Sequence, residues 1–314
     1  MVEQLSVTPV FSRSDLVAAF GERLSFDEPL SKYSSFQTGG PARYFLSAQT
    51  EEQICHAVAI ADRLGLAFFL LGGGSNLLVS DDGFDGLVIH VQVKGLSLVS
   101  PTEIECGAGE SLMALVNFAC ESSLTGFEFA AGIWGSVGGA IFGNAGAYGG
   151  EIAHVLTSIR LVDRKGKSKV VPPEYCRFAY RDSYLKKTRE IVTSCRITLR
   201  RGIKSDIRGK IDEILASRAG KHPDRLTAGS FFKNIPDASQ PHGKLPAGKL
   251  LEEAGAKSLS VGGARVYEKH ANIIVSDGTA TSKDIRQLAD MMKAKVFERC
   301  GIRLEEEVMP VGKF

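Results

Sequence analysis

Two glycine-rich runs constrain the fold of this chain more than any other feature. The first comes directly after Leu66–Leu71, an unbroken apolar segment that predicts a buried strand. Because glycine has no Cβ, consecutive backbone N–H groups at such a strand exit can turn towards an anion such as a pyrophosphate. A tight turn without a ligand remains the structural alternative. The candidate residues are Gly72, Gly73, Gly74, Ser75 and Asn76.

The second run lies within Phe129–Gly150, a stretch of membrane-spanning length that carries no charged residue. It contains eight glycines; each costs about 1 kcal/mol in a helix interior, and the stretch has no basic flank or aromatic belt, so we do not expect a transmembrane helix. We predict instead a second loop whose backbone contacts a large, partly apolar cofactor. Its candidate residues are Gly135, Ser136, Gly138, Gly139 and Asn144.

Other nucleotide and hydrolase motifs are absent from the sequence. Gly107-Ala108-Gly109 is followed by Leu112 where a dinucleotide-binding fingerprint needs its third glycine, and Leu161 occupies the position of the first glycine of a P-loop. No G-x-S-x-G or H-E-x-x-H motif occurs. The histidines do not cluster in the sequence, so metal sites and hydrolytic triads are not expected. They are His56, His90, His154, His222, His242 and His270.

Composition narrows the class of protein. With 314 residues, 44% of them hydrophobic and 24% charged, the chain is typical of a globular protein built from two or three subdomains. A net charge of +2 with alternating signs does not indicate a nucleic-acid-binding protein, although small anionic ligands remain open. The six cysteines are scattered, which favours buried thiols in a reducing compartment. Residues 1–15 lack a signal-peptide pattern, so we expect a cytoplasmic location without membrane attachment.

Hydrophobic patterns and turn residues predict three blocks of mixed α and β structure. The first opens with a strand at 42–47, a helix that Thr50 caps and Gly65 ends, and the strand at 66–71, which together resemble a βαβ unit. Further strands are predicted at 86–93, 103–107, 191–199, 271–275 and 304–311. Another pair of strands is predicted on either side of the turn at 163–166. Helices are predicted at 111–122, 207–218, 250–254 and 282–300.

Three polar residues stand in unusual sequence contexts. Arg181 follows an aromatic, strand-like segment, and its structural alternative is a salt bridge. Ser230 lies between Gly229 and two phenylalanines, which suggests a hydroxyl in an apolar pocket, although an N-cap or turn serine is the commoner case. Glu307 belongs to an acidic run beside a terminal strand, a position that is usually solvated surface.

Taken together and in this order, the motifs resemble the UDP-N-acetylenolpyruvoylglucosamine reductase family. The resemblance spans about Tyr33 to Gly312, and eight motifs in one order make chance similarity implausible. It rests on the Gly72–Leu78 loop, GI-x-GSVGGA, NAGAYG, YRDS, AGSFFKN, PAGKLLEEAG, KHAN and LEEEV. Two departures flank the flavin loops: Trp134 stands where the family usually has proline, and Ile141-Phe142-Gly143 replaces another apolar run.

This resemblance implies an α+β protein with a two-subdomain FAD-binding fold of the PCMH/vanillyl-alcohol-oxidase type and a C-terminal α+β substrate domain. The expected boundaries are 20–95 and 96–204 for the two FAD-binding subdomains and 205–314 for the substrate-binding domain. The implied activity is that of UDP-N-acetylmuramate dehydrogenase: NADPH-dependent reduction of UDP-N-acetylglucosamine enolpyruvate to UDP-N-acetylmuramate, for peptidoglycan and cell wall synthesis. FAD is the implied cofactor, NADPH the co-substrate and the sugar nucleotide the partner; we expect a monomer.

The resemblance also implies roles for individual residues. Ser230 would be the general acid, with Arg181 and Glu307 beside it at the enol ether and carboxylate. Arg181 suits the stabilisation of charge that develops at C2, because a guanidinium stays protonated. Glu307 could polarise the alkene or relay the proton, and the sequence leaves both roles open. The remaining assignments are Lys221, Asn234 and His270 facing the sugar nucleotide, and Arg218 near the flavin.

Two rival functions would share parts of this pattern. A carbohydrate or alcohol oxidase of the same flavin fold often tethers its flavin through His or Cys near the first glycine loop, and Gly72–Ser80 contains neither residue. A non-catalytic flavin- or sugar-nucleotide-binding module would give no reason for Ser230, Arg181 and Glu307 to occur together with both loops. Both considerations favour the reductase.

Overall fold

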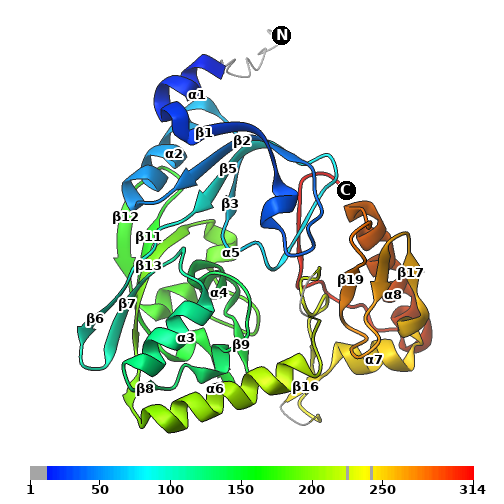
Figure 1. Ribbon diagram of the computed structural model, residues 1–314. Helices are drawn as coiled ribbons and strands as arrows, with labels where there is room; N and C mark the ends of the chain where they lie inside the picture. Colours follow the sequence, from blue (N-terminus) through cyan, green and yellow to red (C-terminus); the bar gives the residue numbers. More distant parts are fainter. Residues whose placement is uncertain (1–12, 224–225, 241–242) are drawn as a thin grey trace, which may run out of the picture.

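The computed structural model describes residues 13–223, 226–240 and 243–314 (Figure 1). Most of the N-terminal segment that we interpreted as lacking a signal peptide, and His242, therefore lie outside the described residues. Three hydrophobic cores organise the rest of the chain. The largest spans the first two blocks, a second fills the C-terminal block, and a small third core lies under one face of the first sheet.

The first block is a four-stranded sheet with the order β1-β2-β5-β3. Strands β2 (Pro41–Ala48) and β3 (Phe68–Leu71) are both parallel to β5 (Phe84–Val91), while β1 (Leu24–Pro29) is antiparallel to β2. Helix α2 (Glu51–Leu64) connects β2 to β3, so the predicted strand–helix–strand unit is confirmed. Its cap is also as predicted, since the Thr50 side chain accepts from Gln53 N.

The second block is a five-stranded antiparallel sheet with the order β12-β11-β13-β7-β6. Its strands are β6 (Leu96–Ser100), β7 (Glu103–Gly107), β11 (Leu156–Val162), β12 (Ser168–Val171) and β13 (Ile191–Thr198). Its helices are α3 (Leu112–Glu121), α4 (Val137–Gly143) and α5 (Leu185–Thr188). Strand β6 was not predicted, because its outward residues are apolar and exposed rather than polar.

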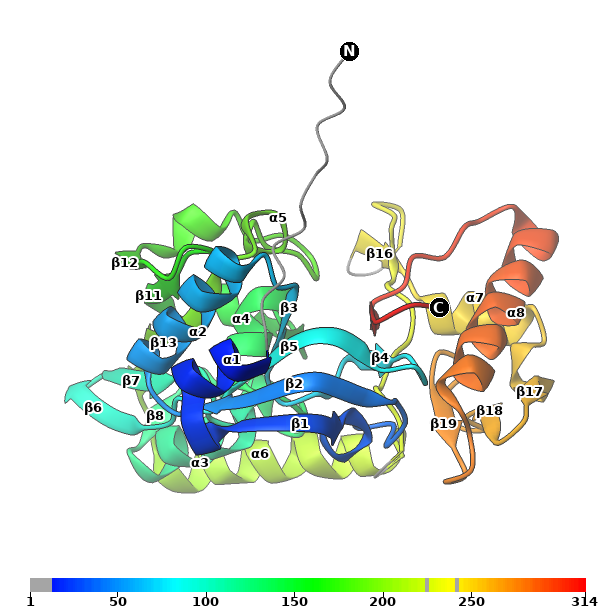
Figure 2. The same ribbon diagram turned by 90° about the horizontal axis from the view of Figure 1, so that it is seen from above.

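Helix α6 (Lys204–Ala219) begins the third stretch of sequence but packs against the core of the first two blocks through Ile207, Ile211 and Ile214. The C-terminal block itself contains β17 (Ser260–Val261), β18 (Ala264–Val266) and β19 (Ile274–Ser276), with α7 (Ala247–Glu253) and α8 (Ser282–Cys300). Figure 2 shows this block beside the first two, with α6 running beneath them.

The end of the chain returns to the first block. Strand β20 (Met309–Val311) pairs in parallel with β4 (Leu77–Val79), which directly follows the first glycine run. This pairing ties the C-terminal block to the glycine loop. The remaining short elements are α1 (Arg13–Phe20), β8 (Leu124–Thr125), β9 (Gly146–Ala147), β10 (Gly150–Glu151), β14 (Arg200–Arg201), β15 (Ile235–Pro236), β16 (Lys244–Leu245) and 3₁₀ turns at Gly21–Arg23, Leu30–Tyr33, Glu128–Ala130, Ile152–His154, Pro173–Cys176 and Ala256–Ser258.

Several local predictions were wrong. The expected strand 304–311 is confined to Met309–Val311, preceded by an isolated bridge between Glu306 and Phe232. Cys300, the last residue of α8, is exposed, and Cys55 packs against the main core but is only half-buried, so not all six thiols are buried. All six cysteines are free. Among the described residues, no helix combines the length and the apolarity needed to cross a membrane.

Candidate active site

A cavity of about 1390 Å³ lies between the two glycine runs and the C-terminal block. Typical small-molecule pockets enclose roughly 300 to 1,000 Å³, so this cavity has room for a cofactor and a substrate together. Ten of the predicted cofactor-binding residues line it: Gly72, Gly73, Gly74, Ser75, Asn76, Gly135, Ser136, Gly138, Gly139 and Arg218. Ser230, Arg181, Glu307 and Asn234 line it as well.

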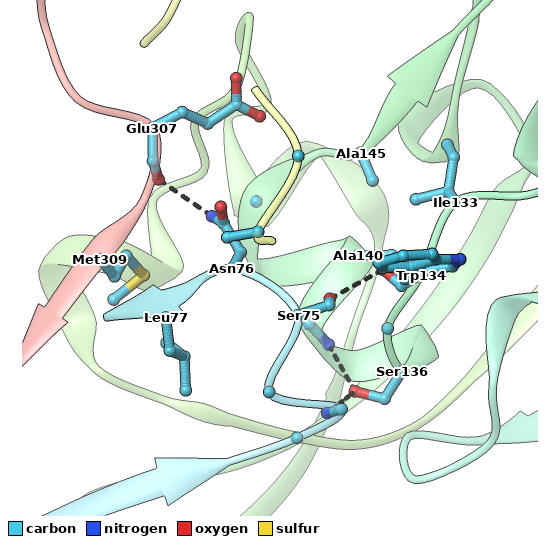
Figure 3. A pocket seen from close by; sticks show the side chains of 18 of the residues that line it. Ser75, Asn76, Leu77, Ile133, Trp134, Ser136, Ala140, Ala145, Glu307 and Met309 are labelled. Atoms are coloured by element: carbon cyan, nitrogen blue, oxygen red, sulfur yellow. Dashed lines mark hydrogen bonds between the residues drawn. The ribbon is translucent and has the colours of Figure 1, made fainter. Parts of the chain in front are cut away.

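The two glycine runs are held against each other by hydrogen bonds. Ser75 Oγ donates to the Trp134 carbonyl at 2.8 Å, and Gly73 N donates to Ser136 Oγ at 3.3 Å (Figure 3). The backbones are so close that a Cβ on Gly73 would lie 2.8 Å from the Cα of Gly135. Ser136 also caps α4 by accepting from Gly139 N. The sequence therefore needs glycine here for contact between loops as well as for an open surface.

The wall made by these loops fits a cofactor that is contacted mainly by backbone. A Cβ on Gly143 of the second run, which lines the cavity, would meet no atom within 4 Å outside its own helix and chain neighbours, so it would face open space. Arg218 supplies the complementary charge. Its Nε is buried without a hydrogen-bond partner among the described residues, and its guanidinium lies 5.4 Å from the centre of the Tyr148 ring. A half-buried cation whose buried Nε has no hydrogen-bond partner suits an anionic ligand.

Asn144 does not line the cavity. It is fully buried at the end of α4, where it has a positive φ of 46°, and its Nδ2 donates to the Ala179 carbonyl at 2.9 Å. Ser183 Oγ donates to the Phe142 carbonyl at 2.7 Å. These two bonds attach the segment around Arg181 to the second glycine run, so in this structure Asn144 positions other residues of the site.

Arg181 lies in a tight turn, and the strand-like expectation for this segment was wrong. Ala179 and Asp182 bond to each other through both backbone groups, which gives Arg181 a positive φ of 53°. Its Nε lies 2.7 Å from Glu307 Oε1. Arg181 thus forms a salt bridge, the structural alternative, and also lines the cavity.

Glu307 is not solvated surface, because only 22% of its side chain is exposed. Burial raises the pKa of its carboxyl above the ordinary value, against the opposing effect of Arg181, Lys186 and Lys233. Its backbone is fixed at both ends: Asn76 Nδ2 donates to the Glu307 carbonyl at 2.9 Å (Figure 3), and Glu307 N donates to the Phe231 carbonyl at 2.8 Å. The first glycine run therefore holds the acidic residue directly.

Ser230 forms an isolated bridge with Ile273, away from any helix start, which excludes the N-cap alternative. The next two residues, Phe231 and Phe232, are buried in the C-terminal core, and Gly229 before it has a positive φ of 76°. This arrangement leaves Ser230 half-buried at the cavity wall with an apolar floor behind it. The residue following Ser230 bonds to Glu307, so both candidates lie on neighbouring segments.

The predicted sugar-nucleotide residues are placed differently from one another. Asn234 lines the cavity and accepts from Ala247 N at 3.1 Å, whereas Lys221 is exposed and neither Lys221 nor His270 is among the lining residues. His270 stacks on His222 with ring centroids 5.8 Å apart. Two histidines thus do come together, although distance in the sequence hid this. Burial, with nearby Arg218, lowers the pKa of His222 to about 4.

Sequence reasoning missed several cavity residues. His222, Tyr180, Lys186, Arg265 and Tyr267 all line the cavity. Tyr180 and Lys186 belong to the same YRDSYLK segment as Arg181, and that proximity was a usable signal. The others reach the cavity only through tertiary folding. Within the described part of the chain, no group of three or more His, Cys, Asp or Glu side chains could hold a metal ion.

Comparison with known proteins agrees with this geometry. A family model described as "FAD binding domain" matches residues 42–171, and one described as "UDP-N-acetylenolpyruvoylglucosamine reductase, C-terminal domain" matches residues 222–311. The reductase of Lachnoclostridium phytofermentans is 39% identical over 298 residues, which are 93% of this chain and 94% of that protein. The chain belongs to the UDP-N-acetylenolpyruvoylglucosamine reductase family.

Other members of the family are similar to this chain over most of their length. The reductase of Streptococcus thermophilus is 38% identical over 301 residues, 96% of each chain. A crystal structure of UDP-N-acetylenolpyruvylglucosamine reductase from Thermus caldophilus has a TM-score of 0.77 and 33% identity, and it covers 92% of this chain and 98% of its own. The chain is an FAD-dependent oxidoreductase with the FAD-binding fold and C-terminal domain expected from the sequence.

Proposed function

We propose that the cavity combines FAD, held by the two glycine runs, with the enolpyruvyl sugar nucleotide, held by the C-terminal block. The reaction of the family is the NADPH-dependent reduction of UDP-N-acetylglucosamine enolpyruvate to UDP-N-acetylmuramate in peptidoglycan precursor synthesis. The observation that carries the proposal is the convergence of Ser230 and the Arg181–Glu307 ion pair on the cavity that both glycine runs line.

FAD fits the site because the loop backbones, the open space at Gly143 and the unpartnered Arg218 together accommodate a large anionic cofactor. The loops would contact its pyrophosphate through backbone N–H groups, and Arg218 would neutralise part of the ligand charge. Bound FAD supplies hydride transfer, from NADPH and then to C3 of the enolpyruvyl group, which no side chain of the protein can perform.

The side chains of the opposite wall handle the charge and the proton. The Arg181 guanidinium stabilises negative charge that develops at C2 and on its carboxylate. Ser230 donates a proton to C2, a step that requires neighbouring cations to make the hydroxyl a better acid. Glu307 relays the proton, a role supported by its burial, which raises the carboxyl pKa and so increases the protonated fraction. Lys221, Asn234 and His270 are proposed to bind the sugar nucleotide.

The proposal extends to organisation. We retain the division into 20–95, 96–204 and 205–314, with α6 as the connection that packs on the earlier blocks. We also propose that the chain works as a monomer in the cytoplasm, where its free thiols stay reduced and NADPH is supplied. Size-exclusion chromatography with light scattering tests the monomer.

The experiment that tests the function follows flavin absorbance in the purified protein. Anaerobic NADPH should bleach the yellow colour, and UDP-N-acetylglucosamine enolpyruvate should restore it with formation of UDP-N-acetylmuramate. Acid precipitation should release free FAD, as expected where no tethering residue occurs in the first loop. Flavin that stays with the protein pellet, or recovery of colour with oxygen and a simple alcohol substrate but not with the enolpyruvyl nucleotide, would favour the rival oxidase.

A further inference from the structure

Lys186 is a cavity-lining cation that has no part in the chemistry described above. It lies on the short helix α5, five residues after Arg181, and only 30% of its side chain is exposed. Its neighbour Lys187 is exposed and does not line the cavity. The two adjacent lysines therefore differ in environment, and only one of them faces the site.

The Lys186 ammonium closes the turn that presents Arg181. Its Nζ donates to the Arg181 carbonyl at 2.6 Å, and it lies 3.7 Å from Asp182 Oδ1. Arg181 has a left-handed backbone conformation that non-glycine residues adopt only when other contacts impose it. The hydrogen bond from Lys186 is such a contact. It fixes the backbone from which the Arg181 guanidinium reaches Glu307.

Keeping this cation half-buried is unfavourable in isolation. Burial lowers the pKa of Lys186, while Asp182 and Glu307 oppose that effect and Lys233 adds to it. Its closest carboxylate, Asp182, is half-exposed and beyond ordinary hydrogen-bond distance. The fold thus retains a partly desolvated charge, whose ion pair with Asp182 is long and half-exposed, next to a cavity that would bind an anionic substrate.

We propose that Lys186 is a positioning residue of the active site, which holds the Arg181 turn in its catalytic conformation and adds a positive charge beside Glu307. This inference rests on the proposed roles of Arg181 and Glu307. The positioning role and the electrostatic role both follow from the location of the Lys186 ammonium, because it bonds to the Arg181 backbone and acts electrostatically on the Glu307 carboxyl.

The titratable groups that act on the Glu307 carboxyl or on the Lys186 ammonium come from three segments. Arg181, Asp182 and Tyr180 belong to the turn before α5, Lys186 to α5 itself, and Lys233 to the segment after Ser230. Lys233 is paired with Glu305, so its effect on Glu307 is shared with a second carboxylate. Removal of Lys186 leaves Arg181 and Lys233 as the cations that keep the pKa of Glu307 from rising further.

The test compares Lys186→Met, Lys186→Arg and the control Lys187→Met in the FAD-loaded enzyme. Lys186→Met should slow flavin reoxidation by the enolpyruvyl nucleotide by roughly ten- to a hundredfold, because displacement of a catalytic group by about 1 Å can cost a hundredfold. It should also move the pH limb assigned to Glu307 upward by roughly 0.5 to 1 unit, as expected for loss of a partly screened opposite charge. Lys186→Arg should restore the limb, and Lys187→Met should match the wild type.

The pH limb separates a positioning role from a purely structural one. A slower Lys186→Met enzyme with an unmoved limb, or a limb that Lys186→Arg does not restore, contradicts the proposal. Melting temperature and bound-flavin absorbance identify a variant that simply fails to fold, in which case the limb of Lys186→Gln decides the matter. Glu307→Gln identifies the limb: if it persists there, the role of Glu307 in the proposed function fails, independently of Lys186.

Discussion

The two walls of the cavity are built on opposite principles. One wall consists of the two glycine runs, has no charged side chain between Phe129 and Gly150, and is held together by backbone contacts and serine hydroxyls. The other wall presents Arg181, Lys186 and Glu307, partly buried charges whose pKa values or pairings depend on one another. Shape dominates the first wall and electrostatics the second.

This difference teaches that cofactor binding and proton chemistry can be assigned to separate parts of one cavity. A wall of backbone gives a fixed surface whose properties change little with pH. A wall of coupled charges can deliver a proton and stabilise developing charge, but it depends on each neighbouring ion. Substitutions on the first wall should therefore affect FAD retention, and substitutions on the second should affect the later half-reaction.

Gly73→Ala should break the first wall and so impair FAD binding, on which both half-reactions depend. Its Cβ would lie 2.8 Å from both the Gly135 Cα and the Ser136 backbone N, so the loops must separate. We expect the free energy of FAD binding to weaken by at least about 3 kcal/mol. The FAD dissociation constant, measured by flavin fluorescence, should therefore rise roughly a hundredfold. The control is Gly209→Ala, in α6 and free of close contacts, which should raise stability by about 1 kcal/mol. Normal FAD affinity in Gly73→Ala would refute the role of loop contact.

Arg181→Met should affect the second wall and leave the first wall intact. Loss of a group that stabilises developing charge costs on the order of a hundred- to a thousandfold in rate, and flavin reoxidation is the step that should show it. Arg181→Lys should recover only part of the rate, because an ammonium does not reproduce the geometry of a guanidinium. The FAD dissociation constant should stay within about twofold in both variants. An Arg181 variant that loses FAD as readily as Gly73→Ala would contradict the assignment of cofactor binding and charge stabilisation to separate walls.

The adjacent carboxylates Glu306 and Glu307 should differ in how they make the free energy of unfolding depend on pH. Burial raises the pKa of Glu306, but Arg286 and Lys293 bond to it and bring the net pKa below the ordinary value, whereas the pKa of Glu307 is raised. The stabilisation from Glu306 is present above its unfolded pKa and is lost as pH falls through the folded pKa. The raised pKa of Glu307 has the opposite sign: its stabilisation is present below the unfolded pKa and is lost as pH rises through the folded one.

Glu306→Gln should therefore lower the free energy of unfolding at neutral pH by roughly 2 to 3 kcal/mol, between the values for exposed and buried ion pairs. Urea unfolding should show that this loss disappears below the folded pKa of Glu306. Glu307→Gln should cost less at neutral pH than Glu306→Gln. Equal losses from the two substitutions would show that the carboxylates share one environment.

Lys221→Ala should have the smallest effect. Lys221 is exposed beyond the end of α6 and outside the cavity lining, so a contact to a bound diphosphate would be screened by solvent. We expect the KM for the enolpyruvyl nucleotide to rise by about fivefold, equivalent to roughly 1 kcal/mol, with flavin content unchanged. Steady-state kinetics checks this. An unchanged KM would leave Lys221 as a surface residue without a role in binding.

The elements that sequence predicted well are those whose signals are local. The cap at Thr50, the stop at Gly65, the strand Glu103–Gly107 and the long C-terminal helix each carry their information within a few residues. The glycine runs were also recognisable, because the absence of side chains is visible in one dimension. Local signals thus gave most of the secondary structure and one wall of the cavity.

The other wall depends on contacts between distant segments. The bond between Asn76 and Glu307 joins residues 231 positions apart, and no pattern near either residue predicts it. The His222–His270 pair was missed for the same reason. The positive φ of Arg181 was missed for another reason: it depends on hydrogen bonds within the turn and from Lys186, and its residue type favours no such conformation. Sequence identified the chemistry of Arg181 and Glu307 through the family resemblance, and the fold explains how they meet.

Transient kinetics of Ser230→Ala tests most directly whether cofactor binding and proton transfer belong to separate walls of the cavity. Flavin reduction by NADPH and reoxidation by UDP-N-acetylglucosamine enolpyruvate are followed separately by stopped-flow absorbance. Since the hydroxyl is needed only for proton transfer to C2, reduction should proceed at nearly the wild-type rate, and reoxidation should fall by roughly a hundred- to ten-thousandfold. Ser230→Cys should retain more reoxidation activity than Ser230→Ala. Equal slowing of both half-reactions, together with lower stability, would contradict the account.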